Sequence, residues 1–307
     1  LQRYGNTSSL RIAMENKDHL ETAPDYQESM QDFGFQWFRI EDVYSGKISS
    51  SVDPFVSHRI KYFTLLLLTE GETNHEVDFI TYTLEKGYCL FISQERIHRF
   101  HRTSTGKGYV MNFTEDFMVR NFSQSAFSKI SFLSNYVLNP AMFKDFGDIE
   151  LFITALEREL ALDLGIVKEN LVASMLTVFL LKAQLHAGHD VKSYHGDFAT
   201  FSKFQYYVSL FHKESRSAKH YANLLNISYK ELNTLTKVFT ESTAKDYIND
   251  YTILEAKRSL ASTNLSIKEI AFDYGFKEAT NFIKFFKRAT GDTPMKFRET
   301  RFGVSKN

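Results

Sequence analysis

Two stretches near the C-terminus carry polar side chains spaced as on one face of a helix. An asparagine can form paired hydrogen bonds with adenine, and a lysine can bind guanine or a phosphate. The two faces therefore predict contacts with DNA, while an ordinary solvated surface is the alternative for each residue taken singly. If residues 228–240 and 278–289 are helical, the outward positions are Lys230, Asn233, Thr234 and Lys237 in the first, and Glu278, Thr280, Asn281, Lys284, Lys287 and Arg288 in the second.

The surrounding sequence predicts the elements that position these faces. Helix, tight turn and second helix are expected twice, at about 218–239 and 266–289, with Asn226 and Gly275 in the turns. Ser228–Glu231 and Ser266–Glu269 each have the spacing of a capping box, which marks the start of a helix. Residues 243–262 are predicted to form one connecting helix. The repeated pattern indicates two helix-turn-helix units in a domain of residues 201–299.

Residues 221–228, 265–276 and 282–294 read YANLLNIS, LSIKEIAFDYGF and FIKFFKRATGDTP. These stretches resemble the DNA-binding domain of the AraC/XylS family of bacterial transcription regulators. The resemblance implies a protein that reads two consecutive segments of the major groove, with Thr280 and Lys284 on the bases. Lys287 and Arg288 are expected on phosphates. The first unit departs from the family pattern at Asn226, at residues 241–242 and at Thr252 in the connecting helix.

Charge is distributed unevenly along the chain. The 37 basic and 37 acidic residues balance overall. Residues 201–307 hold 18 basic and 11 acidic residues, a net charge of +7, whereas residues 1–200 hold 19 and 26, a net charge of −7. A basic end on an acidic body is consistent with a polyanionic partner. With 43% hydrophobic and 24% charged residues, the chain is not of the disordered, charge-rich class.

The N-terminal half has the pattern of short strands separated by glycine turns. Predicted strands over residues 33–117 include Phe35–Ile40, Tyr62–Thr69 and one alternating strand at Glu76–Leu84. Such a series predicts a sandwich or barrel, and the family resemblance implies a cupin-like sensory barrel. Residues 1–32 are predicted to be an N-terminal arm, and residues 118–195 a helical dimerisation region and linker. The expected fold class is therefore α+β in two domains.

Two amphipathic stretches within residues 147–187 predict helices with apolar surface to spare. One apolar face can cover the barrel, and the other can pair with a second copy of the chain. A helix buried within a single subunit is the alternative. The first interpretation predicts a homodimer.

Several histidines and tyrosines are candidates for the lining of an effector pocket in the barrel, with structural histidines as the alternative. A cupin metal enzyme uses a His-x-His pair, and no second histidine follows His58 at that spacing. We expect no metal, no cofactor and no catalytic residue. The candidate pocket residues are His58, Tyr62, His75, Tyr82 and His98.

The remaining sequence features concern the location of the protein. Cys89 is the only cysteine, so no disulfide can form within the chain. No stretch reaches the ~18 apolar residues that a membrane span needs. These features predict a cytoplasmic protein without a membrane partner. Met14 is an alternative start to Leu1, which makes residues 1–13 a candidate upstream piece.

The sequence thus predicts a homodimeric transcription regulator and not an enzyme. Its barrel is expected to bind a small-molecule effector, with a sugar as one candidate. Its C-terminal domain is expected to bind double-stranded promoter DNA, and RNA polymerase is an expected partner. Two alternatives stay open: a cupin-type metal enzyme with an attached DNA-binding domain, and a regulator without a small-molecule ligand.

Overall fold

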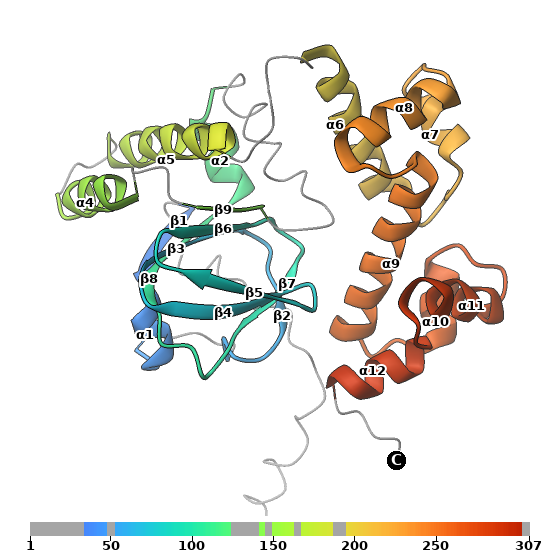
Figure 1. Ribbon diagram of the computed structural model, residues 1–307, viewed down its shortest axis with the longest axis horizontal. Coiled ribbons are helices and arrows are strands. Elements are labelled where there is room, and N and C mark those ends of the chain that lie inside the picture. Colours follow the sequence, from blue (N-terminus) through green and yellow to red (C-terminus); the bar gives the residue numbers. More distant parts are fainter. Residues whose placement is uncertain are drawn as a thin grey trace, which may run out of the picture.

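The computed structural model describes residues 34–47, 53–123, 141–144, 149–162, 167–186 and 195–302. These residues form an N-terminal domain of two antiparallel sheets and a C-terminal domain of helices, which lie side by side (Figure 1). The predicted α+β class with two domains is confirmed. The N-terminal arm predicted for residues 1–32 lies outside the described residues. No helix among the described residues is long and apolar enough to cross a membrane.

Two sheets make up the N-terminal domain, and all their paired strands are antiparallel. The larger sheet has the order β1-β8-β3-β6-β9 and the smaller has the order β2-β7-β4-β5. The larger sheet consists of β1 (Phe35–Arg39), β3 (Phe63–Glu70), β6 (Tyr88–Ile92), β8 (Lys107–Phe113) and β9 (Ala141–Lys144). The smaller consists of β2 (His58–Arg59), β4 (Glu72–Val77), β5 (Ile80–Glu85) and β7 (Ile97–Phe100).

The larger sheet is buried on both faces, which explains the unbroken apolar run in β3. Side chains alternate between the faces of a strand. Leu66 and Leu68 pack in the core that includes residues of both sheets. Leu65 and Leu67 pack in a second core on the opposite face, together with Ile153 of α4 (Ile149–Leu160). Helices α5 (Val167–His186) and α2 (Glu115–Asn121) complete that second layer, while α1 (Ile40–Tyr44) follows β1.

Two predictions for this domain are wrong. The strand predicted at Glu76–Leu84 is a hairpin, because the chain turns at Asp78 and Phe79 between β4 and β5. Both turn residues have left-handed backbone, with φ of 48° and 72°, which glycine, asparagine or aspartate normally adopts but phenylalanine does not. The range 118–195 is not wholly helical, because β9 lies within it and pairs with the edge of β6. Four residues of strand are too short for a periodic signal.

The C-terminal domain contains the two predicted helix-turn-helix units. Serine side chains cap α8 and α10 through complete capping boxes at Ser228–Glu231 and Ser266–Glu269. Thr243 caps α9, because its side-chain hydroxyl accepts a hydrogen bond from the backbone N–H of Asp246. The helices are α6 (His195–Phe211), α7 (Ala218–Leu224), α8 (Tyr229–Thr240), α9 (Ala244–Ser262), α10 (Ile267–Asp273), α11 (Ala279–Thr290) and α12 (Pro294–Phe302).

The connecting helix α9 contributes to the core of both units. Tyr247, Ile248 and Tyr251 pack with α6, α7 and α8 in the first core. Ile253 and Leu260 pack with α10, α11 and α12 in the second core. The two units are therefore built on a single helix, as the sequence predicted.

Two left-handed glycines in the second unit provide a test of its turn geometry. A Cβ at Gly275 (φ +69°) would lie 2.3 Å from the carbonyl oxygen of Lys213, whereas a Cβ at Gly291 (φ +84°) would meet nothing within 4 Å. Left-handed backbone costs a non-glycine residue about 1–2 kcal/mol. We expect Gly291→Ala to lower the free energy of unfolding by about that amount and Gly275→Ala by more. Denaturant unfolding followed by circular dichroism measures both free energies of unfolding. Equal decreases for the two variants would contradict the close approach of Gly275 to the carbonyl oxygen of Lys213.

Candidate nucleic-acid interface and effector pocket

The second recognition helix, α11, presents the predicted polar face. Phe282 and Phe286 anchor the helix in the core, and both are fully buried. The opposite side chains are exposed. In the described part of the chain, the three basic ones form no ion pair with an acidic residue, so their charge is available to a ligand. The exposed residues are Glu278, which is the N-cap, and Thr280, Asn281, Lys284, Lys287 and Arg288.

The first recognition helix, α8, differs from the prediction at one position. Lys230, Thr234 and Lys237 are exposed. Asn233 is half-buried, and its side-chain oxygen accepts a hydrogen bond from the backbone N–H of Ala244 at 3.0 Å. Asn233 therefore ties α8 to the start of α9, and it is half-buried where the sequence predicted an outward position.

A loop between α6 and α7 links the two units directly. The guanidinium of Arg216 lies 3.8 Å from the ring centroid of Phe276 and donates a hydrogen bond to the carbonyl of Tyr274 at 2.8 Å. Lys213 forms a 2.6 Å ion pair with Asp273. These contacts supplement α9 and fix the second unit against the first. The sequence pattern gave no signal for them, because they join positions 58 and 60 residues apart.

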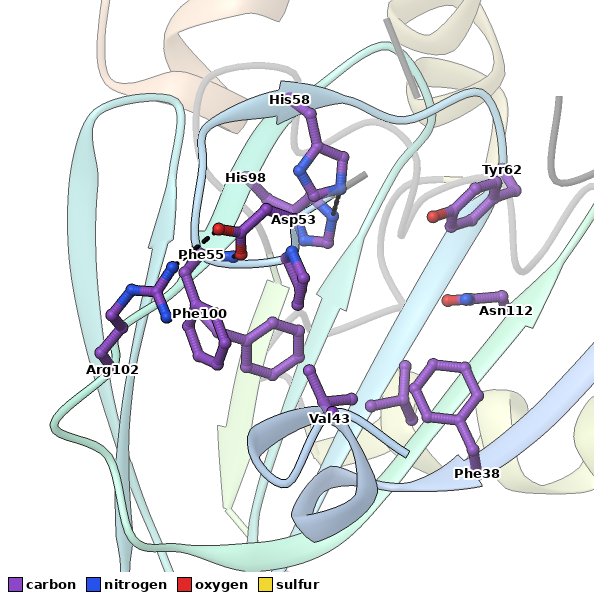
Figure 2. A pocket seen from close by; sticks show the side chains of 13 residues that line it. Phe38, Val43, Asp53, Phe55, His58, Tyr62, His98, Phe100, Arg102 and Asn112 are labelled. Atoms are coloured by element: carbon purple, nitrogen blue, oxygen red, sulfur yellow. Dashed lines mark hydrogen bonds and ion pairs between the residues drawn. The ribbon is translucent and has the colours of Figure 1, made fainter. Parts of the chain in front are cut away.

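The N-terminal domain contains a cavity of about 260 Å³ between its sheets (Figure 2). Three predicted residues, His58, Tyr62 and His98, line it. His75 and Tyr82 are not among the lining residues, so the structure does not bring the predicted set together. The prediction missed ten lining residues, which come from separate elements and of which six have apolar side chains. The other lining residues are Phe38, Val43, Gly46, Asp53, Pro54, Phe55, Phe100, Arg102, Val110 and Asn112.

The polar groups of the cavity are placed at opposite sides of it. Tyr62 and Asn112 lie together on one wall, facing the histidines across the cavity (Figure 2). The side-chain oxygen of Asn112 accepts a hydrogen bond from Thr64 at 2.8 Å. Asp53 and Arg102 form a 2.7 Å ion pair, and Arg102 also lies over the ring of Phe55 at 4.4 Å. The charged pair is thus self-neutralised, and most of the lining is uncharged.

Three buried histidines form a hydrogen-bonded row beside the cavity. Nδ1 of His58 lies 2.9 Å from the carbonyl oxygen of Val56, which can only accept, so Nδ1 carries the proton. Nε2 of His58 then accepts from Nε2 of His98 at 3.0 Å, and Nδ1 of His98 accepts from Nε2 of His75 at 3.0 Å. Among the described residues, Nδ1 of His75 has no hydrogen-bond partner.

The row is electrically neutral because burial disfavours the charged imidazolium. Burial lowers the pKa of His58 and, more strongly, that of His98, and it lowers the pKa of His75 to about 3. The contacts use opposite nitrogens of His98, so the three rings do not converge on one point. Among the described residues, no group of three or more histidine, cysteine or acidic side chains could hold a metal ion.

The neutral row predicts acid-sensitive stability. A histidine with a pKa of about 3 when folded and about 6.5 when unfolded stabilises the fold above pH 6.5, and this contribution falls as the pH falls. Between pH 7 and pH 5, His75 should lose about 2 kcal/mol of stabilisation. The stability difference between the wild type and His75→Gln should shrink by that amount. Urea unfolding followed by the fluorescence of Trp37 measures it, and a difference that does not change with pH would refute the neutral state.

Comparisons with known proteins agree with this geometry. A family model described as a helix-turn-helix domain matches residues 221–300. The probable transcription factor PqrA of Proteus vulgaris is 37% identical over 78 residues, which cover 25% of this chain and 64% of PqrA. The raffinose operon transcriptional regulatory protein RafR of Pediococcus pentosaceus is 32% identical over 76 residues, which cover 25% of this chain and 27% of RafR. This chain thus spans less than two thirds of either relative.

Two solved structures are also similar. A crystal structure of ToxT from Vibrio cholerae covers 88% of this chain and 99% of its own at 12% identity, with a TM-score of 0.44. The DNA-binding domain of AdpA, solved with a target DNA, covers 34% of this chain and 98% of its own at 18% identity, with a TM-score of 0.32. On the family match, residues 221–300 of this chain form a helix-turn-helix domain.

Proposed function

We propose that this protein is a transcription regulator that binds promoter DNA through α8 and α11. The observation that carries the proposal is the pair of exposed polar faces on one rigid domain, with Lys284, Lys287 and Arg288 free of acidic partners among the described residues. Recognition helices enter the major groove, and successive turns of the groove are about 34 Å apart. Two units joined by α9 and by Arg216 would then occupy neighbouring groove segments, with RNA polymerase as a further partner.

Base contacts and phosphate contacts should be separable on α11. We expect Lys284→Ala to cost about 1–3 kcal/mol on a specific site and less on other DNA, because a base contact discriminates. Lys287→Ala should weaken binding to all duplexes alike and reduce the salt dependence of log K by about one unit, because a phosphate contact releases counterions. The measurement is titration of both variants across a salt series.

The probes for this experiment are a duplex selected from a random-sequence pool by the wild-type chain and a scrambled duplex of the same composition. Equal losses on the two duplexes for Lys284→Ala would place that residue on the backbone and not on a base. Failure of the wild-type chain to enrich any duplex from the pool would overturn the proposed function itself.

The cavity is the proposed effector site, and its lining indicates the class of ligand. Phe38, Phe55 and Phe100 supply aromatic surface, and Tyr62 and Asn112 supply polar groups on one wall. Burying a hydroxyl without a hydrogen-bond partner is unfavourable. A sugar would place several hydroxyls against apolar walls, so this lining favours a small, mainly apolar ligand with one polar end. This proposal assigns no catalytic role to the histidine row.

The homodimer remains part of the proposal, and an apolar groove between α4 and α5 supports it. The groove has a volume of about 380 Å³ and is lined by Phe152, Met175 and Phe179 together with exposed apolar side chains. Leu151 is 70% exposed and Val178 is 56% exposed, although both are large and apolar. Contiguous exposed apolar surface marks interaction sites in soluble proteins. A second copy of the same two helices would bury both residues.

Charge substitution in this groove tests the dimer. Val178→Glu would place a carboxylate in the buried centre of the interface, so we expect the full chain to sediment as a monomer at micromolar concentration. Leu210→Glu is the matched control, because Leu210 is also exposed, at 49%, but lies on α6 of the other domain. The control should sediment like the wild type. A wild-type chain that is already monomeric would exclude this interface.

A further inference from the structure

A buried carboxylate joins the two domains. Asp78, in the turn between β4 and β5, accepts hydrogen bonds from Arg258 of α9 on both of its oxygens, at 2.8 and 2.6 Å. It also accepts one from Arg96 of its own domain at 2.7 Å. The side chains of Asp78, Arg96 and Arg258 are 2%, 1% and 5% exposed. One acid therefore bridges two arginines from different domains, out of contact with water.

The turn that carries Asp78 has an unusual backbone conformation, and its contacts with the other domain explain it. Asp78 and Phe79 both have positive φ, which aspartate tolerates in a turn but phenylalanine rarely adopts, so the strain lies at Phe79. Such strain persists only where the surroundings hold it, and it is frequent at functional sites. The ring of Phe79 packs edge-on against Phe297 of α12, with centroids 5.3 Å apart. Both residues of the turn thus contact the DNA-binding domain.

The same contact is one residue away from the cavity. The backbone N–H of Asp78 donates to the carbonyl of Ile97, and the N–H of Ile97 donates to the carboxylate of Asp78. The next residue, His98, lines the cavity. On the neighbouring strand, His58 lines the cavity, and the adjacent Arg59 lies 3.8 Å from Glu255 of α9. Strands β2 and β7 therefore touch the cavity at one residue and the inter-domain contact at the next.

We propose that Asp78 is a positioning residue that latches the DNA-binding domain onto the strands of the cavity, through its ion pairs with Arg258 and Arg96. This latch rests on the proposed function for its biological meaning, but its structure stands by itself. It is not a cover over the DNA-binding faces, because the polar residues of α8 and α11 are exposed while it is closed. It fixes the direction in which those faces point relative to the cavity.

The charges explain why this latch is sensitive to a single change. Burial by itself would raise the pKa of Asp78, but the charges of Arg258 and Arg96 hold it below its ordinary value, so the carboxylate is ionised. Removing one partner of a buried ion pair leaves the other charge buried without compensation, which is strongly unfavourable. In Asp78→Asn, Arg96 would lose the carboxylate of Asp78, and Arg258 would keep only Glu255 of its own helix, so the two domains would no longer share an ion pair at this position. Separation of the domains lets water solvate Arg258.

The test is the distance between the domains in the full chain, without DNA. Spin labels at Glu85→Cys in β5 and Thr263→Cys after α9 report it by pulsed electron resonance, because both positions are exposed and the native Cys89 is buried. The wild type should give one narrow distance distribution, and Asp78→Asn a broad one. Glu76→Gln is the matched control: Glu76 lies in the same hairpin and pairs with Arg99 of the same domain at 2.8 Å.

The outcomes separate a latch from general damage. A narrow distribution in Glu76→Gln with a broad one in Asp78→Asn supports the latch. A narrow distribution in Asp78→Asn, or equal broadening in both variants, overturns it. Should Asp78→Asn fail to fold, Arg258→Lys serves in its place, since it keeps the charge but loses the two-point contact with Asp78 and should broaden the distribution. Because no DNA is present, failure of DNA binding would not affect this result.

Discussion

The C-terminal domain depends on one helix that is packed on several sides at once. Residues of α9 belong to the cores of both helix-turn-helix units. A third side carries Glu255 and Arg258 toward the strands of the N-terminal domain. A helix with neighbours all round cannot rotate or shift without disturbing every contact. The orientation of both recognition helices therefore follows from the placement of α9.

The contacts around α9 differ in kind, and this difference determines which of them can open. The two cores are apolar and close-packed, and they hold α7, α8, α10 and α11 as fixed bodies. The contact with the N-terminal domain instead combines the ion pairs of Asp78 with Arg258 and of Arg59 with Glu255 and a ring–ring contact. A buried ion pair gains little net stability over its separated, hydrated charges. The domain interface is thus the place where the chain can change its arrangement while both domains remain folded.

Much of the C-terminal domain could be predicted from the sequence because its signals are local. The capping boxes at Ser228 and Ser266 fixed two helix starts, and the apolar spacing fixed the buried faces. The features that were missed depend on residues distant in sequence. The turn at Asp78 has phenylalanine where glycine is usual, and the partner of Asp78, Arg258, lies 180 positions away. Asn233 was predicted to face outward, because its hydrogen bond with the backbone of Ala244 joins two different helices. The cavity was found only in part, since ten of its thirteen lining residues come from separate strands, loops and a helix and share no pattern in the sequence.

The row of three imidazoles has a consequence for selectivity. Both nitrogens of His58 and both nitrogens of His98 are already engaged, one of them with the carbonyl of Val56. Although both histidines are polar side chains, they can offer a guest only the faces and carbon edges of their rings. A guest that sought a nitrogen would first have to break the row, which would leave another ring unpaired farther inside. The two histidines consequently present aromatic surface to the cavity, so that side selects a ligand by its shape. Hydrogen bonding can select a ligand on the opposite wall, where Tyr62 and Asn112 lie.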